Sequence, residues 1–327
     1  MERIGVDIGG TGIKAGIVSQ NGIIIGKKEC PTDTKAGFNK VISDIRTLVM
    51  DLLDTYGRKA EEIEVLGFGV PSFINQRGEV TCVNLNWYEE DFMEALKEKF
   101  PEFNIGAEND ATVAAIAESK FGSMKGYEYG IFLTLGTGVG GGIIINGKPF
   151  VGAHGMGSEI GHMVIGRNEF DCKCGNNGCF ETFCSATGIT QYTRMLLEKE
   201  EGSILRNKDE FGKVELSAKM IFEAYRLKDE LAIKSITRFK EYLAIALANI
   251  INFFDPHIIA IGGGVSRASD IILDGLEDEV RKHILYKNEE MAQIVAAKLG
   301  NEAGIIGAAF LEPSINKVLK IERTSKM

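Results

Sequence analysis

The sequence has no surplus of positive charge. Its 37 lysines and arginines are outnumbered by 46 aspartates and glutamates, so the net charge at pH 7 is -9 and the pI is about 5.2. A negatively charged protein is repelled by the phosphates of nucleic acids and of anionic membranes. The net charge therefore argues against general binding to either, and no nucleic-acid partner is expected.

Long hydrophobic runs are also missing. The most apolar segment, residues 242–254, is too short to span a bilayer and contains Asn249 and Asn252, so it predicts a buried helix. No basic and apolar leader precedes the first predicted strand, which argues against secretion. We therefore expect a cytoplasmic protein with no membrane partner.

No linker rich in proline, glycine and serine divides the chain, although its 327 residues suit two ordinary domains. A boundary near residues 118–124 is inferred instead from a repeat. The pattern strand, Gly/Thr turn, strand occurs at residues 3–18 and again at 131–145. The expected domains are residues 1–120, joined by a C-terminal helix within about 303–327, and residues 121–302.

Glycine, in contrast, is abundant, with 39 residues clustered after predicted strands. The first cluster, residues 9–12, is followed by another strand-like run at 13–18, so a hairpin is expected. Rossmann and P-loop folds are disfavoured because both need a helix directly after the glycines. The remaining pattern is mixed α/β. Helices are expected near residues 38–56, 89–99, 110–121, 187–199, 216–227, 229–254 and 303–312, and further strands near 63–69, 103–107 and 257–261.

These glycine turns are candidate phosphate sites, because successive N–H groups in such turns attract anions. Beside the first turn, a carboxylate and an ammonium could hold Mg²⁺ and a polyphosphate, although a tight hairpin with an incidental lysine remains an alternative. The glycines after residues 257–261 suit an approaching adenine or ribose, or a helix entry. The candidate nucleotide-binding residues are Asp7, Gly9, Gly10, Thr11, Lys14, Thr134, Gly136, Thr137, Gly138, Gly263 and Gly264.

The most specific motif combines one imidazole with three thiols: His162, Cys172, Cys174 and Cys179. Thiolate and imidazole are the ligands of structural zinc sites, which have four protein ligands and no open position. Buried thiols or a disulfide are the alternatives. A closed zinc site would leave the chemistry to its neighbours, and Glu159 and Glu181 flank the motif.

Another candidate pair, Asn109-Asp110, stands where a predicted strand ends and a helix begins. Asp110 could be only the N-cap of that helix. Together with phosphate turns, however, a carboxylate here could accept the proton of an alcohol that attacks the γ-phosphate of ATP.

These motifs together resemble the ROK family of sugar kinases, within the actin-like superfamily, over essentially the whole chain. The cysteine motif is the most specific of them, while the first and second glycine motifs are shared more widely. The segments that carry the resemblance are Asp7 to Lys14, Asn109 to Ala111, Leu135 to Gly142, Gly157 to His162 and Cys172 to Glu181.

The resemblance implies a two-domain α/β protein with the actin-like (ribonuclease H-like) ATPase fold and an interdomain cleft. It implies a hexose kinase that uses ATP and Mg²⁺, contains structural Zn²⁺ and forms a homodimer or homotetramer. Asp110 would be the general base for the sugar 6-hydroxyl, and His162 would also bind zinc through its other ring nitrogen. The implied sugar ligands are Asn84, Asn109, Asp110, Glu159, His162 and Glu181.

Two departures from the family pattern affect the sugar pocket. Many relatives have Pro-Gly where this chain has Pro71-Ser72, and their Asn-Leu-Pro reads Asn84-Leu85-Asn86 here. The stretch after Cys179 looks like that of bacterial glucokinases, so glucose is the first choice. N-acetylmannosamine, fructose, mannose and allose remain alternatives, because one hydroxyl contact can decide between sugars.

Two functions of other classes are alternatives. The family includes sugar-responsive transcriptional regulators, but these have a helix-turn-helix segment ahead of the first glycine hairpin, and no recognition helix fits before Asp7. An actin-like assembly protein would have no need of carboxylates placed around a zinc site. Both alternatives are less favoured than the hexose kinase.

Overall fold

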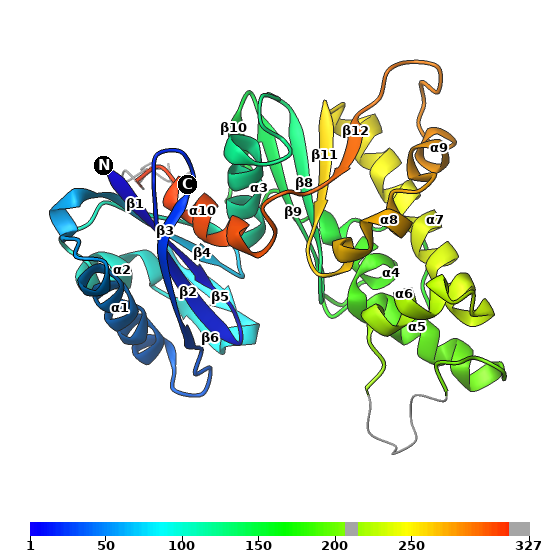
Figure 1. Cartoon of the computed structure of the whole chain (residues 1–327), viewed down its shortest axis with the longest axis horizontal. Helices are drawn as coiled ribbons and strands as arrows, with labels where there is room; N and C mark the ends of the chain where they lie inside the picture. Colours follow the sequence, from blue (N-terminus) through cyan, green and yellow to red (C-terminus); the bar gives the residue numbers. More distant parts are fainter. Residues whose placement is uncertain (207–214, 314–327) are drawn as a thin grey trace, which may run out of the picture. The chain divides into compact units, whose positions relative to one another are not determined.

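The computed structural model describes residues 1–206 and 215–313. These residues form two compact units, each built around a five-stranded sheet (Figure 1). Of the described residues, the first unit contains 1–121, 151–157 and 302–313, and the second contains 122–150, 158–206 and 215–301. Of the C-terminal segment expected to join the first domain, residues 314–327 lie outside the described part of the chain.

The sheet of the first unit begins with the expected hairpin. Strands β1 (Glu2–Ile8) and β2 (Gly12–Val18) are antiparallel and place Asp7 opposite Lys14. Strand β1 runs parallel to β4 (Ile63–Val70), which in turn runs parallel to β7 (Ile105–Asn109). The turn between β1 and β2, residues 9–11, is called the first glycine turn below. In order across the sheet, the strands are β3 (Ile24–Pro31), β2 (Gly12–Val18), β1 (Glu2–Ile8), β4 (Ile63–Val70) and β7 (Ile105–Asn109).

Helices cover both faces of this sheet. Helix α1 (Phe38–Thr55) buries an apolar stripe with helical spacing, and α2 (Phe92–Lys99) shares its core. Helices α3 (Asp110–Phe121) and α10 (Ala303–Ala309) contribute separate apolar clusters. The α10 backbone lies so close to β4 that a Cβ on Gly67 would be 1.8 Å from the Ala308 carbonyl oxygen.

The helix expected near residues 89–99 begins later, at Phe92. Residues just before it form β6 (Trp87–Glu90), which pairs with β5 (Val80–Cys82) in a two-stranded ribbon. The ribbon places Trp87 in an aromatic cluster with Phe38. Cross-strand pairing and burial therefore determine the conformation of residues 87–90, and local helix propensity does not.

The second unit has a sheet with helices α4 to α9 gathered on one side (Figure 1). Across the sheet the strands are β10 (Lys148–Phe150), β9 (Val139–Ile145), β8 (Gly130–Leu135), β11 (Ile258–Gly262) and β12 (Gln293–Ala296). The helices are α4 (Phe180–Cys184), α5 (Ala186–Lys199), α6 (Ala218–Arg226), α7 (Glu230–Phe254), α8 (Ser269–Ile272) and α9 (Leu276–Arg281).

Helix α7 is the buried apolar helix expected from residues 229–254. The Asp229 side chain accepts a hydrogen bond from the Ala232 N–H and caps its N-terminus. One face of α7 packs into the main hydrophobic core of the second unit. Among the described residues, no helix combines the length and apolar character that a bilayer crossing requires.

Both sheets present candidate residues at the ends of parallel strands. In the first unit, the carboxyl ends of β1 and β7 carry Asp7 and Asn109, on either side of β4. In the second unit, β8 and β11 are parallel neighbours and lead into residues 136–138 and Gly263. Ligands of α/β sheets bind beyond such carboxyl ends, so this register is what positions the candidate sites. Residues 136–138 are called the second glycine turn below.

Candidate functional site

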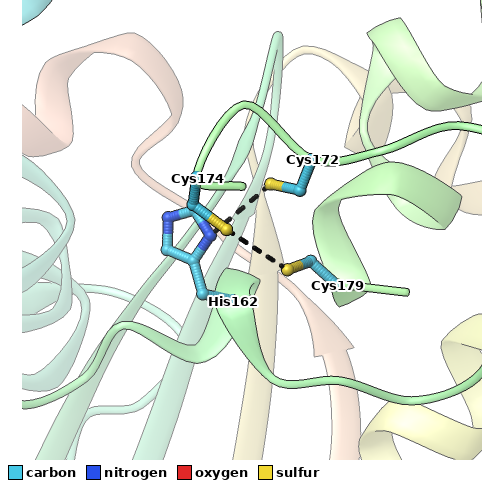
Figure 2. A group of neighbouring side chains, drawn as sticks. All are labelled: His162, Cys172, Cys174 and Cys179. Atoms are coloured by element: carbon cyan, nitrogen blue, oxygen red, sulfur yellow. Dashed lines mark hydrogen bonds between the residues drawn. The ribbon is translucent and has the colours of Figure 1, made fainter. Parts of the chain in front are cut away.

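Four side chains of the Cys/His loop, defined as residues 162–181, point toward one another (Figure 2). They are His162, Cys172, Cys174 and Cys179, and their ligand atoms all lie within 4.8 Å of one another. His162 Nδ1 lies 3.7 Å from Cys172 Sγ, and Cys174 Sγ lies 3.6 Å from Cys179 Sγ. All three cysteines are free thiols, so the disulfide alternative has no support.

This geometry fits zinc. Zinc bonds of about 2.3 Å to sulfur and about 2.1 Å to nitrogen separate the ligand atoms of a tetrahedral site by about 3.6 to 3.8 Å. The two measured separations, 3.7 and 3.6 Å, have that length. Since His162 contributes Nδ1 to the cluster, Nε2 is the ring nitrogen that can meet a substrate hydroxyl. The four donors can therefore hold a structural zinc ion.

Two glycines shape the loop. Gly175 and Gly178 have φ values of 93° and 88°, which L side chains rarely adopt. A Cβ on Gly178 would also lie 1.8 Å from the Gly166 carbonyl oxygen. The Gly175 N–H donates to the Cys172 carbonyl oxygen at 2.9 Å and closes a tight turn. This turn brings the thiols back onto one point.

The three thiols differ in their electrostatics. A backbone N–H at Asn176 and the neighbouring thiols lower the pKa of exposed Cys174 to about 7, whereas burial raises the pKa of Cys179 to about 12. Burial also raises the pKa of Cys172. A metal bound here would have to displace protons from the two buried thiols, because zinc binds thiolates.

Arg238 of α7 contacts the Cys/His loop and the aromatic residues next to it. Its guanidinium carbon lies 4.1 Å from the ring centroid of Tyr192, 4.9 Å from that of Phe183 and 5.2 Å from that of Tyr242. Phe183 and Tyr242 are themselves stacked at 3.7 Å. The guanidinium is therefore held by aromatic faces, an arrangement that favours arginine over lysine.

The same guanidinium donates to Asn168 Oδ1 at 3.0 Å, and Asn168 in turn contacts a later part of the loop and α4. Its Nδ2 donates to Thr182 Oγ1 at 2.8 Å, and its backbone N–H donates to Asn177 Oδ1 at 2.9 Å. Arg238 thus fixes the loop independently of any metal. Sequence reasoning did not find this residue, because it lies 70 positions from Asn168 and carries no motif.

Glu159 and Glu181 lie beside the cluster in different ways. Glu159 is exposed and precedes the short helix η3 (Ile160–His162), whose last residue is the candidate zinc ligand His162. Glu181 is half-buried, with Oε1 4.0 Å from Cys172 Sγ. Its Oε2 accepts a hydrogen bond from the Val139 N–H at 2.9 Å. One carboxylate thereby links the cysteine cluster to the end of the second glycine turn.

The structure also brings the second-unit phosphate candidates together. Thr134 is paired with Gly262 across β8 and β11. Gly263 has a φ of 86°, and a Cβ there would lie 2.5 Å from the Leu135 carbonyl oxygen. Gly263 and exposed Gly264 therefore lie next to the second glycine turn, where a nucleotide could contact both segments.

In the first unit, Asp7 and Lys14 meet across the hairpin. Burial raises the pKa of Asp7 above its ordinary value, and the charge of Lys14 partly offsets that effect. Gly10 and Thr11 are exposed at the tip of the first glycine turn, which the Gly9 N–H closes on the Gly12 carbonyl oxygen at 3.0 Å. The carboxylate, ammonium and turn can together face a phosphate and its metal.

Asn109, rather than Asp110, caps α3. Its Oδ1 accepts from the N–H groups of Ala111 and Thr112 at 3.0 and 3.2 Å, and its Nδ2 donates to the Ser72 carbonyl oxygen at 3.3 Å. Asp110 Oδ1 also accepts from the Ala111 N–H, at 2.7 Å. Because Asn109 already supplies the cap, the N-cap alternative does not explain the carboxylate at position 110.

The second departure from the family pattern changes the backbone. Asn86 has a φ of 56°, and its Nδ2 donates to the Thr34 carbonyl oxygen at 3.1 Å. Proline is fixed near a φ of -65°, so this loop cannot have the conformation of an Asn-Leu-Pro segment. Asn84 is exposed in the short helix η2 (Val83–Leu85) just before it. A sugar contact by Asn84 would therefore depend on the loop shape that the left-handed Asn86 sets.

A pocket of about 540 Å³ also opens in the second unit, beside Glu159. Its lining is largely apolar and includes Phe150, Met163, Phe253 and Phe254. A hexose needs polar partners for its hydroxyls, and most of this lining has none to offer. Of the candidate sugar ligands, Glu159 lines this pocket, whereas His162 and Glu181 do not.

Comparison with known proteins places these motifs in context. A model of the ROK family matches residues 3–314. The chain is 35% identical to a glucokinase from Halalkalibacterium halodurans, with 94% of each chain covered, and 30% identical to an N-acetyl-D-glucosamine kinase from Histophilus somni, with 94% and 97% covered. It is also similar to the crystal structure of a ROK family glucokinase from Streptomyces griseus in complex with glucose and AMPPNP. That similarity has a TM-score of 0.78 and 31% identity and covers 94% of this chain and 98% of the other.

Proposed function

The chain belongs to the ROK family and has the actin-like ATPase fold of its sugar kinases, and we propose that it is an ATP-dependent glucokinase. It would transfer the γ-phosphate of ATP to the 6-hydroxyl of glucose. One observation carries the proposal: the candidate sugar ligand Glu181 is hydrogen-bonded to Val139, at the end of the candidate phosphate turn. Phosphoryl transfer requires a sugar and a phosphate to be held next to each other in this way.

The proposed division of work gives the proton transfer to Asp110. Its carboxylate would accept the proton of the 6-hydroxyl as that oxygen attacks the γ-phosphorus. Asn84, Asn109, Glu159, His162 and Glu181 are the proposed ligands of the other sugar hydroxyls. The supporting observation is chemical, because amides, carboxylates and imidazole can donate to and accept from hydroxyls.

The proposed nucleotide ligands are the two glycine turns with their neighbours. Asp7 would hold Mg²⁺, which neutralises charge on the transferring phosphate. Lys14 and the turn amides would hold phosphate oxygens, and Gly263 and Gly264 would lie against the nucleoside. Zinc, held by the Cys/His loop, would supply rigidity to Glu181 and His162 and no reacting atom.

The proposed setting is the cytoplasm, where a reducing environment keeps the zinc thiols reduced. A homodimer or homotetramer is part of the same proposal and rests on the family resemblance. Light scattering on the purified protein measures that state directly.

The activity is tested by ADP release, measured with a coupled assay in the presence of ATP and Mg²⁺. The sugars are glucose, N-acetylglucosamine, N-acetylmannosamine, mannose, fructose and allose. We expect the highest kcat/KM with glucose. Preference for N-acetylglucosamine would favour the second candidate function, to which the 30% identical relative points. No turnover with any of the six would contradict the hexose kinase.

Gly138→Ala is expected to weaken glucose binding by about tenfold or more. A Cβ at this position would lie 2.3 Å from Glu181 Oε2, so the carboxylate must move while the backbone can stay. Losing a charge-assisted hydrogen bond to the sugar accounts for the size of the effect. Calorimetric titration with glucose, without nucleotide, measures it.

Gly136→Ala is the matched control, because the nearest atom to a Cβ there is 4.0 Å away. Its glucose affinity should stay within about twofold of the wild type. The reason is that the weaker binding of Gly138→Ala comes from displacement of the Glu181 carboxylate and not from the loss of a glycine in the turn. Equal glucose affinities in the two variants would show that Glu181 does not bind the sugar.

A further inference from the structure

The second glycine turn is held by the first turn of α5. The Gly136 carbonyl oxygen accepts from the Ala186 N–H at 2.8 Å, and the Thr137 carbonyl oxygen accepts from Thr187 Oγ1 at 2.7 Å. The first bond uses a backbone group that every residue has. The second depends on the side chain at position 187, which is not among the candidate nucleotide or sugar ligands.

Holding these carbonyl groups orients the amides that follow them. In a trans peptide the C=O of one residue and the N–H of the next point in opposite directions. Because α5 binds the carbonyl oxygens of Gly136 and Thr137, the N–H groups of Thr137 and Gly138 point away from α5. Within residues 1–206 and 215–313, neither N–H has a hydrogen-bond partner. Two successive amides of this kind form an anion-binding concavity.

The N–H groups on either side of these two amides are already in use. The Gly136 N–H donates to the Gly138 carbonyl oxygen at 2.9 Å, and the Val139 N–H donates to Glu181. Among the described residues, Thr187 is thus the one group outside the turn that orients the Thr137 to Gly138 peptide. Its neighbour is glycine, so rotation of this peptide has little steric cost once the hydroxyl is removed.

We propose that Thr187 is a positioning residue for nucleotide binding. Its hydroxyl holds the Thr137 carbonyl group on the α5 side, so that the Gly138 N–H faces the phosphates of ATP. This inference rests on the proposed kinase function and adds to it a residue that contacts neither substrate. It also makes α5, which follows directly on the Cys/His loop and α4, part of the nucleotide site.

Thr187→Val tests the proposal, because valine has the shape of threonine without the hydroxyl and a similar helix propensity. Binding of the Mg²⁺ complex of AMPPNP is measured by calorimetry, and KM is measured for ATP and for glucose. We expect affinity for the nucleotide to fall about threefold to tenfold, the range for one hydrogen bond of ordinary strength. Glucose affinity and zinc content should stay unchanged, and Thr187→Ser should restore nucleotide binding.

Thr190→Val is the control on the same helix. Its hydroxyl donates to the Ala186 carbonyl oxygen at 2.6 Å and lies within α5, so this variant should bind the nucleotide as the wild type does. Wild-type nucleotide affinity in Thr187→Val, or weak binding in Thr187→Ser, would overturn the inference while the kinase proposal stands. A wild-type protein that binds no AMPPNP would overturn both.

Discussion

Asp110→Asn is expected to lower kcat by at least about 10²-fold, while glucose still binds. An amide has nearly the shape of a carboxylate but cannot accept the proton of the 6-hydroxyl. The structure makes this variant a clean test, because Asn109 caps α3 through its Oδ1. Asp110 Oδ1 accepts from the Ala111 N–H, and an asparagine Oδ1 can do the same.

The measurement pairs kcat from the ADP-release assay with a calorimetric Kd for glucose. A fall in kcat with an unchanged Kd identifies a group that acts in the transition state. Asp91→Asn, at the exposed position before α2, is the control for removing a carboxylate from the first unit and should keep wild-type kcat. A near wild-type kcat in Asp110→Asn would remove Asp110 from the proposed role.

The parts of the site that could be predicted from the sequence are those that local spacing determines. The donors of the Cys/His cluster lie within one loop, and positive-φ glycines fold that loop back on itself. The first hairpin was predicted for a similar reason, since its turn residues and its two apolar runs are adjacent in sequence.

What could not be predicted depends on contacts between distant segments. The bond between Glu181 and Val139 joins residues 42 positions apart, and neither position carries a signal for the other. The strand at residues 87–90 exists because Val80 and Cys82 pair with it. The residues next to position 89 in the sequence do not reveal that pairing. The left-handed Asn86 follows from an anchor at Thr34, which lies 52 positions away.

These distant contacts also explain why the motif alone does not identify every residue that forms the site. The motif names the donors of the Cys/His cluster, but Arg238 and Asn168 hold the loop that presents them. Such supporting residues orient metal ligands and raise the affinity of a site. The loop therefore has two sources of order, the zinc donors and a guanidinium held by three aromatic rings.

Cys174→Ser separates these two sources and is expected to abolish stable zinc binding. A serine hydroxyl stays protonated near neutral pH and is a poor zinc ligand, whereas the pKa of Cys174 is lowered to about 7. We also expect glucose affinity to fall at least about tenfold, because Glu181 and His162 would lose the ion proposed to fix their positions. Zinc is measured by mass spectrometry of the dialysed protein, and the Kd for glucose by calorimetry.

Cys30→Ser is the control, since Cys30 lies in β3 of the first unit, far in sequence from the Cys/His loop. It should keep wild-type zinc and glucose binding. Retained zinc in Cys174→Ser would contradict the four-ligand site. Lost zinc with unchanged glucose affinity would mean instead that Arg238 and Asn168 suffice to hold Glu181 and His162. The metal would then stabilise the folded loop without positioning the sugar ligands. In that case Glu181 and His162 would keep the same positions whether or not zinc is bound.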